Sequence, residues 1–184
     1  GSGDFGTLFE YDPANNDTII NKHSFSPSDN GKTPTGTLVK APNGKLYGIT
    51  ANGGIYGYGT IFEVDPVTEN VVKKIDFDAS IGKSPSGGLT LATNGKLYGV
   101  VEKGAYLDRG AIFEYDISLN TLKKLKDIYS IGNGPKASLI QATNGKLYGT
   151  TAFGGIGYGV VFSYDIALDS LTRHDRFDRF TEGA

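Results

Sequence analysis

The chain has 184 residues, and its 18 basic and 20 acidic side chains give a formal net charge of -2 at pH 7. This length predicts one domain with a buried core, and the balanced charge disfavours a nucleic-acid partner. The absence of cysteine excludes disulfides, thiolate metal sites and a cysteine nucleophile. No stretch approaches the roughly 20 consecutive apolar residues of a membrane span, so we expect none in this segment.

An internal repeat dominates the sequence. The string Asn-Gly-Lys-Leu-Tyr-Gly occurs three times, at 43–48, 94–99 and 144–149. The spacing of about 50 residues is typical of a repeat architecture. Around each copy the same four short runs, labelled A to D, return in the same order. They are rich in Leu, Ile, Val, Tyr and Thr and are bounded by glycine and asparagine, which predicts β-strands.

In chain order, the sequence opens with run C at 7–12 and run D at 18–25, and three complete sets follow. The A runs lie at 36–41, 88–92 and 138–142, and the B runs lie at 45–50, 96–101 and 146–151. The remaining C runs lie at 60–65, 111–116 and 160–165, and the remaining D runs lie near 70–77, 120–128 and 170–177. No helical periodicity of useful length separates these runs.

Four antiparallel strands per repeat, joined by short turns, predict an all-β fold: a β-propeller built of four-stranded antiparallel blades. Runs A and B occur three times, whereas C and D occur four times, so about three and a half blades are present. We expect one propeller segment over 1–184, with repeats at approximately 1–35 (the half blade), 36–86, 87–136 and 137–184. Since natural propellers have about 4 to 8 blades, we expect the chain to be part of a larger ring or array.

The Gly-Lys-Leu-Tyr-Gly strand, the Gly-Gly loop and the strand ending in Tyr-Asp-Pro resemble kelch repeats, although the tryptophan usual in the fourth kelch strand is missing. The chain is more similar to the bacterial GloVer tandem repeat, whose units read "NGKLYGTT-GG-GYGTVFEYD". The resemblance covers essentially the whole chain. It implies a secreted or surface-anchored bacterial protein of repeated blades, often delivered by a dedicated secretion system. We therefore expect an extracellular or cell-surface location.

The two ends of the predicted blades differ chemically. In an up-and-down meander the A–B and C–D turns share one end, here called the turn face, and the B–C and D–A loops share the other, the loop face. The turn face has tight Asn-Gly turns and turns that begin with aspartate. A calcium site is the alternative for one of these turns, at Asp12, Asn15, Asn16 and Asp17, but the other copies lack enough oxygen ligands. We expect no metal and no cofactor.

The loop face carries the longer loops, in which glycine permits close backbone approach and aromatic rings can stack on a ligand. Binding residues concentrate on loops that a rigid scaffold holds. The predicted ligand-binding residues are Asn52, Tyr56, Tyr58, Tyr106, Arg109, Phe153 and Tyr158. The alternative is that these tyrosines only pack between blades.

The other candidates favour structural interpretations. The opening glycines at 1, 3 and 6 match a dinucleotide fingerprint only as text, because they lead into a strand. His23 and His174 fall at positions that are apolar in other repeats, so we interpret them as packing residues. No catalytic residue and no nucleophile–base pair is predicted. Residues that recur once per blade are also interpreted as structural, namely Glu10, Glu63, Glu114, Tyr47, Tyr98 and Tyr148.

These patterns predict a noncatalytic ligand-binding or adhesion module of a secreted or cell-surface bacterial protein. Glycans are the favoured ligand class because shallow loops with aromatic and amide groups suit them; a protein ligand on the loop face is the other choice. The alternatives are a structural repeat spacer and a fragment of a propeller enzyme whose catalytic residues lie outside this segment. Because the half blade lacks runs A and B, we expect further blades, another copy or another protein to cover residues 7–25.

Overall fold

The computed structural model of the chain describes residues 3–154 and 157–177. Within these residues the fold is all-β, with four antiparallel sheets and one short 3₁₀ helix, η1 (Tyr106–Asp108). The predicted fold class is therefore confirmed. No helix in the described part of the chain is long and apolar enough to cross a membrane. Residues 1, 2 and 178–184, which include the first predicted glycine and the end of the last predicted repeat, lie outside the described residues.

Each sheet is a meander of consecutive strands. The half blade consists of β1 (Thr7–Asp12) and β2 (Thr18–Ser24). Blade 1 consists of β3 (Lys32–Lys40), β4 (Leu46–Asn52), β5 (Thr60–Val64) and β6 (Val71–Asp76). Blade 2 consists of β7 (Lys83–Leu91), β8 (Leu97–Lys103), β9 (Ala111–Asp116) and β10 (Thr121–Asp127). Blade 3 consists of β11 (Gly132–Pro135), β12 (Ile140–Gln141), β13 (Leu147–Gly154), β14 (Val160–Asp165) and β15 (Ser170–Arg176).

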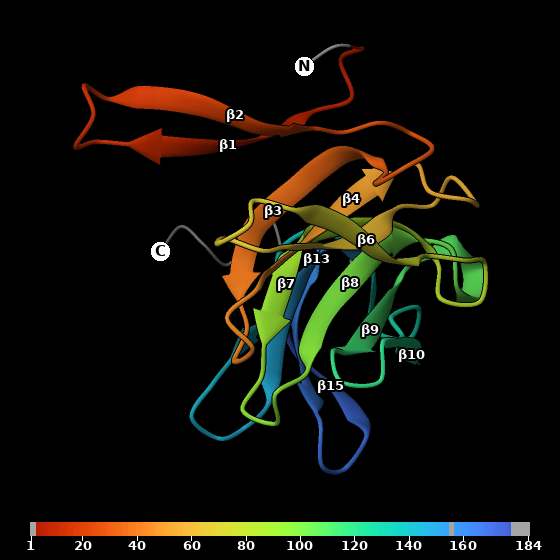
Figure 1. The fold of residues 1–184 in the computed structure, drawn as a ribbon. Helices are drawn as coiled ribbons and strands as arrows, with labels where there is room; N and C mark the ends of the chain where they lie inside the picture. The colour runs from red at the N-terminus through yellow and green to blue at the C-terminus, as the bar shows by residue number, and fades with distance from the viewer. Residues whose placement is uncertain (1–2, 155–156, 178–184) are drawn as a thin grey trace, which may run out of the picture.

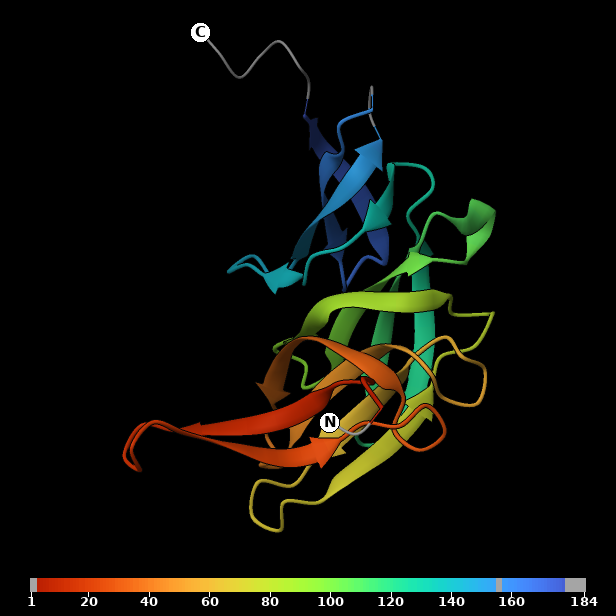
Figure 2. The same ribbon diagram turned by 90° about the horizontal axis from the view of Figure 1, so that it is seen from above.

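The sheets follow one another in space as they do in sequence. In Figures 1 and 2 the half blade lies at one end beside blade 1, and its β1–β2 hairpin extends away from the other sheets. The blue strands of blade 3 lie at the opposite end in Figure 2. The segment is thus an arc of sheets, and its two end sheets are the half blade and blade 3.

The inner strand of each blade contains a bulge that the sequence pattern did not predict. In blade 1, Thr35 pairs with Ile49 and Val39 pairs with Tyr47, so the three residues 36–38 lie opposite a single glycine. The same shift occurs in β7, and in blade 3 it divides the inner strand into β11 and β12. Glycine is required at the bulge: a Cβ on Gly36, whose φ is +74°, would lie 2.6 Å from the Cα of Gly88 in the next blade.

The core lies between adjacent sheets, where burial of apolar side chains supplies the main stabilisation. Phe77 of blade 1 and Phe113 of blade 2 meet edge to face with ring centroids 5.0 Å apart. In each complete blade the C strand packs a phenylalanine ring on the glycine of the B strand. In blade 2, for example, a Cβ on Gly99 would lie 2.5 Å from Cζ of Phe113. The Tyr-Gly pair of the repeat is therefore a packing requirement: the tyrosine is buried in blades 1 and 2 and half-buried in blade 3, and the glycine leaves room for the phenylalanine ring.

Candidate functional site

The two predicted faces exist in the structure. On the loop face, the Gly54 N–H in the B–C loop of blade 1 donates to the carbonyl of Pro27 in the preceding D–A loop at 3.0 Å. On the turn face, the ammonium group of Lys45 in the A–B turn bonds to the carboxylate of Asp65 in the C–D turn. At these contacts a loop-face segment therefore contacts another loop-face segment, and a turn-face segment contacts another turn-face segment.

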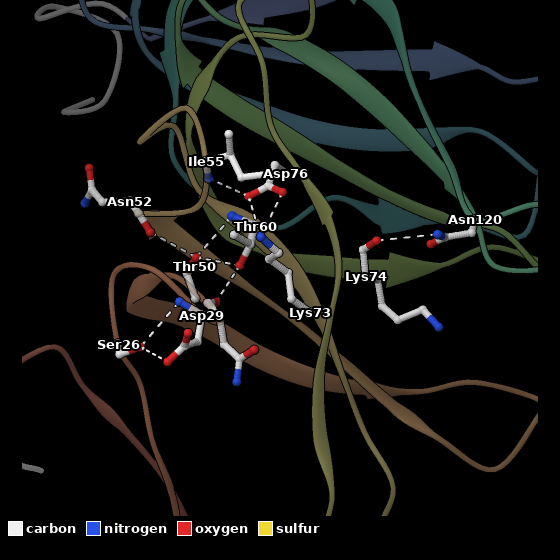
Figure 3. Close-up of polar contacts among 11 residues, drawn as sticks. Ser26, Asp29, Thr50, Asn52, Ile55, Thr60, Lys73, Lys74, Asp76 and Asn120 are labelled. Atoms are coloured by element: carbon white, nitrogen blue, oxygen red, sulfur yellow. Dashed lines mark hydrogen bonds and ion pairs between the residues drawn. The ribbon is translucent and has the colours of Figure 1, made fainter.

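The B–C loop of blade 1 has a buried polar root (Figure 3). The hydroxyl groups of Thr50 and Thr60 lie 2.9 Å apart, and both side chains are fully buried. The Thr50 hydroxyl also donates to the carbonyl of Asn52 at 3.1 Å, and the Thr60 hydroxyl donates to the carbonyl of Asn30 at 2.7 Å. These bonds fix where the loop leaves the sheet.

In blades 1 and 2 an aspartate at the end of the outer strand then orients the loop backbone. The Asp76 carboxylate accepts the Ile55 N–H at 2.9 Å and pairs with Lys73 at 3.0 Å (Figure 3). Blade 2 repeats this device, because the Asp127 carboxylate accepts the Tyr106 N–H at 3.0 Å and is paired with a lysine. The loop conformation is therefore set before any ligand arrives.

Two tyrosines pair on the loop face of blade 2. The rings of Tyr106 in η1 and Tyr129 in the following D–A loop have centroids 4.6 Å apart and are tilted by 59°. Both remain accessible, at 54% and 43% of their surface. Beside them, Asp108 accepts the Gly104 N–H at 2.6 Å and lies 3.3 Å from the ammonium group of Lys83. These two contacts, the Gly104 bond foremost, hold the pKa of Asp108 below its ordinary value, so the carboxylate is charged.

The predicted ligand-binding residues have different surroundings. Tyr56, Tyr106, Arg109, Phe153 and Tyr158 are exposed on the loop face. Tyr58 is half-buried and packs against the core between blades 1 and 2, so for this residue the structure agrees with the packing alternative. Asn52 is also half-buried.

Tyr106 is the predicted residue that the structure joins to another aromatic side chain, and its partner Tyr129 was missed by the sequence reasoning. A signal for Tyr129 was present, because it follows run D and therefore belongs to a D–A loop on the same face.

The turn face contains a repeated hydrogen-bond network. The Tyr98 hydroxyl accepts from the amide of Asn94 at 2.8 Å and donates to the carboxylate of Glu114 at 2.7 Å, which also pairs with Lys96 at 2.7 Å. Burial, followed by the bond to Glu114, raises the pKa of Tyr98 to about 12. In blade 1 the amide of Asn43 and the carboxylate of Glu63 bond to the Tyr47 hydroxyl in the same way, but Lys45 pairs with Asp65 and not with the glutamate. This supports the structural interpretation of the repeated tyrosines and glutamates.

Blade 3 departs from this network and contains a contact that the sequence reasoning missed. Ser163 replaces the glutamate, and Nε2 of His174 lies 2.7 Å from its hydroxyl, with the imidazole stacked on Tyr148. A serine–histidine pair therefore exists although no nucleophile–base pair was predicted. Ser163 is only 1% exposed, so a substrate cannot reach its hydroxyl. The pair ties β14 to β15.

The residues of the alternative calcium site form hydrogen bonds that are typical of turns. The Asp12 carboxylate accepts the Ala14 N–H at 2.9 Å, and the Asp17 carboxylate accepts the Tyr11 hydroxyl at 2.5 Å. Across the described ranges, no group of three or more His, Cys, Asp or Glu side chains is arranged to hold a metal.

The turn face is hollowed between blades. A hollow of about 490 Å³ lies between blades 1 and 2 and is lined by Asn43, Asn94 and Asp116 among others. The corresponding hollow between blades 2 and 3 has about 230 Å³. Both are lined by residues of the A–B and C–D turns.

Successive four-stranded antiparallel sheets define a segment of a β-propeller. Similar solved structures include the extracellular domain of BT4673 from B. thetaiotaomicron, 16% identical over 94% of this chain and 21% of that chain, with a TM-score of 0.62. TolB from Acinetobacter baumannii is 16% identical over 93% of this chain and 42% of that chain, with a TM-score of 0.55. The tricorn protease is 18% identical over 95% of this chain and 16% of that chain, with a TM-score of 0.55.

At these identities the similarity shows the fold alone, and the chain spans less than half the length of each of these three proteins. The model of the Gloeobacter/Verrucomicrobia repeat matches residues 1–131, and the chain therefore belongs to this family. The resemblance that the Asn-Gly-Lys-Leu-Tyr-Gly strings predicted is thereby confirmed. No curated protein matches the chain.

Proposed function

We propose that the chain is a noncatalytic, glycan-binding module of a secreted or cell-surface bacterial protein, with its ligand site on the loop face around Tyr106 and Tyr129. The observation that carries the proposal is the exposed pair of rings, 4.6 Å apart, on a loop whose backbone is already fixed. Aromatic rings stack on the apolar faces of sugar rings, and tyrosine, with an apolar ring and a polar hydroxyl, is enriched at binding interfaces.

Charged groups around the pair suit sugar hydroxyl groups. The Asp108 carboxylate can accept hydrogen bonds, and the exposed Arg109 and the half-buried Lys83 can donate them. Because Asp127 and Asp108 already hold the loop backbone, binding costs little additional ordering of the chain. The site is therefore preorganised and has both an apolar platform and polar edges.

Two further observations support the cellular part of the proposal. The family is a bacterial repeat, and one of the similar structures is an extracellular domain. The noncatalytic part is supported by the burial of Ser163, which removes the serine–histidine pair from contact with a substrate. The alternative is a propeller enzyme whose catalytic residues lie outside this segment.

A glycan array probed with the complete 184-residue chain tests the proposal. For any glycan that binds, Tyr106→Ala and Tyr129→Ala should each weaken binding roughly 10-fold or more, as expected for stacking anchors. Leu119→Ala, which removes an exposed apolar side chain from the turn face, is the matched control and should leave affinity unchanged. Tyr56→Ala and Tyr158→Ala then show how far the site extends over the neighbouring blades.

Three results would contradict the proposal. Absence of binding to every glycan on the array would favour the structural-spacer alternative. Equal affinity of the native chain and both tyrosine variants, with circular dichroism showing an intact fold, would move the ligand site away from the pair. If binding were instead lost in variants of the turn-face hollow, such as Asn94→Ala, the ligand would occupy the opposite end of the blades.

A further inference from the structure

The B–C loop of blade 2 is charged, whereas its counterparts in the other two complete blades are not. Residues 102–110 contain two acidic and two basic side chains, namely Glu102, Lys103, Asp108 and Arg109. The corresponding loops of blades 1 and 3, at 51–59 and 152–159, contain no charged residue. The repeat itself therefore does not require charge at this position, and the charges of blade 2 need an explanation of their own.

Both carboxylates of this loop have structural partners. Glu102 lies 3.3 Å from the ammonium group of Lys136, which belongs to blade 3. Asp108 accepts the Gly104 N–H at 2.6 Å and lies 3.3 Å from the ammonium group of Lys83, at the start of β7. The two carboxylates therefore tie the loop to its neighbours, and each has a cation that compensates its charge.

The two basic side chains of the loop have no such role. Within the described ranges, 3–154 and 157–177, neither Lys103 nor Arg109 has an ion-pair or hydrogen-bond partner for its side chain, and both are exposed. Lys103 nevertheless acts on the same site. The Gly104 N–H and the Lys83 ammonium group lower the pKa of Asp108, and the charge of Lys103 adds to this effect. Two uncompensated positive charges thus flank the Tyr106 side of the aromatic pair.

The neighbouring D–A loop does not cancel this excess. Residues 77–82 lie against the B–C loop, since a Cβ on Gly104 would lie 2.8 Å from the Cα of Gly82. They contain one carboxylate, Asp78, which is bound within its own turn by the hydroxyl and the N–H of Ser80. Apart from the pair of Asp127 with Lys124, the four cations at positions 83, 103, 109 and 136 outnumber the three carboxylates at positions 78, 102 and 108.

From these features we infer that the ligand of the loop face is an acidic glycan, whose sugar rings stack on Tyr106 and Tyr129 while a carboxylate or sulfate group pairs with Arg109 and Lys103. The inference rests on the proposed function, because it names the class of glycan for the same site. A guanidinium group offers parallel N–H donors to an acidic group, which adds orientation to charge attraction. A neutral glycan would make no use of either cation.

Two substitutions in this loop should change binding of an acidic glycan in opposite directions. Arg109→Gln should weaken it roughly 5-fold or more. The loop itself should persist, because Arg109 holds it through its backbone: its N–H donates to the Tyr106 carbonyl at 3.4 Å, and its carbonyl accepts the Gly134 N–H at 3.2 Å. Asp108→Asn should strengthen binding roughly 2-fold or more, because the amide oxygen can still accept the Gly104 N–H while Lys83 loses its counter-charge. Damage to the loop would weaken binding in both variants.

Three acidic polymers, each compared with its own neutral derivative, are the probes. Alginate and polygalacturonate carry only carboxylates and are neutralised by carboxyl reduction, and kappa-carrageenan carries only sulfates and is neutralised by desulfation. Measured by biolayer interferometry on the complete chain, at least one acidic polymer should bind roughly 10-fold more tightly than its neutral derivative. Raising the NaCl concentration from about 0.05 to about 0.5 M should weaken binding of the acidic form alone. Which polymer binds then distinguishes carboxylate from sulfate recognition.

Lys123→Gln is the matched control, because it removes the same charge from an exposed position near the turn-face end of β10 and should leave affinity unchanged. An equal loss for Lys123→Gln and Arg109→Gln would overturn the inference, since the attraction would then belong to the whole chain. Equal affinity for acidic and neutral forms, or binding of neutral glycans alone, would also overturn it. If binding were still lost in Tyr106→Ala, the proposed function would remain. Absence of binding to every acidic polymer and every glycan on the array would overturn both.

Discussion

The buried root of the B–C loop offers a sharp test, because the three blades solve the same packing problem with different residues. Blade 1 uses Thr50 with Thr60, and both are fully buried. Blade 2 uses two apolar side chains, Val101 and Ala111, at the paired positions. Blade 3 uses a threonine at the first position and Val160 at the second. The chain therefore contains natural precedents for some substitutions and not for others.

Thr60→Val reproduces the arrangement of blade 3, whereas Thr50→Val alone has no counterpart. With Val at position 60, the Thr50 hydroxyl can still accept the N–H of residue 60 at 3.1 Å and donate to the Asn52 carbonyl at 3.1 Å. We expect a cost below about 1 kcal/mol. Thr50→Val removes the acceptor of a buried N–H and the donor to Asn52, so we expect a cost of about 1 to 3 kcal/mol.

Urea unfolding of the two variants measures these costs, provided that the m-value is unchanged. Each variant exchanges one hydroxyl for a methyl group in the same cluster, so each is the control for the other. Amide exchange in the loop should accelerate in Thr50→Val and stay near native in Thr60→Val. A larger loss for Thr60→Val would refute the reasoning, because the bond from Thr60 to Asn30 would then matter more than the network at Thr50.

Three further predictions concern the turn face. Tyr98→Phe should destabilise the chain by about 1.5 to 3 kcal/mol in urea unfolding, since the Tyr98 hydroxyl donates to the Glu114 carboxylate. Tyr148→Phe should cost only about 0.5 to 1.5 kcal/mol, because the Tyr148 hydroxyl accepts a hydrogen bond from the Asn144 amide and Ser163 replaces the glutamate. Burial and a glutamate bond raise the pKa of Tyr47 and Tyr98 to about 12, so stability should be complete below pH 10 and fall as the pH rises toward 12; a flat profile in denaturation at pH 9, 10 and 11 would contradict this. Hydrogen bonds from the Ser118 hydroxyl and the Leu119 N–H, with Lys96 nearby, lower the pKa of Asp116 to about 2, so its contribution to stability is present above pH 3.8 and is lost as the pH falls toward 2. Asp116→Asn should therefore make the loss of stability with falling pH less steep. An unchanged slope would assign acid unfolding to other groups.

Strand positions were predictable because each repeat brackets its strands with turn residues of defined chemistry. The predicted C runs at 7–12, 111–116 and 160–165 have the bounds of β1, β9 and β14. The assignment of turns and loops to opposite faces followed from the meander alone. Neither inference needed knowledge of side-chain contacts, and both depended only on period and order.

The inner strands were less predictable, because a bulge changes pairing without leaving a periodic signal. The predicted A run at 36–41 begins four residues late, since the observed strand starts at Lys32, which pairs with Asn52. Its three extra residues are accommodated by close glycine contacts between neighbouring blades, and such contacts depend on how the sheets pack. The Tyr106–Tyr129 pair was missed for a similar reason: it joins two loops that are separated in sequence and approach one another only in the folded blade.

The repeats also show how one scaffold presents different surfaces. The aspartate that accepts the Ile55 N–H in blade 1 has an equivalent that accepts the Tyr106 N–H in blade 2, with similar distances of 2.9 and 3.0 Å. The same backbone frame therefore displays an isoleucine in one blade and a tyrosine in the next. Because the frame is shared, substituting the displayed side chain leaves the blade intact. The displayed side chain can then differ from blade to blade while the Tyr-Gly, Phe and Asn-Gly positions stay constant. The loop of blade 2 shows this most plainly, because among the described loops it alone contains a 3₁₀ helix.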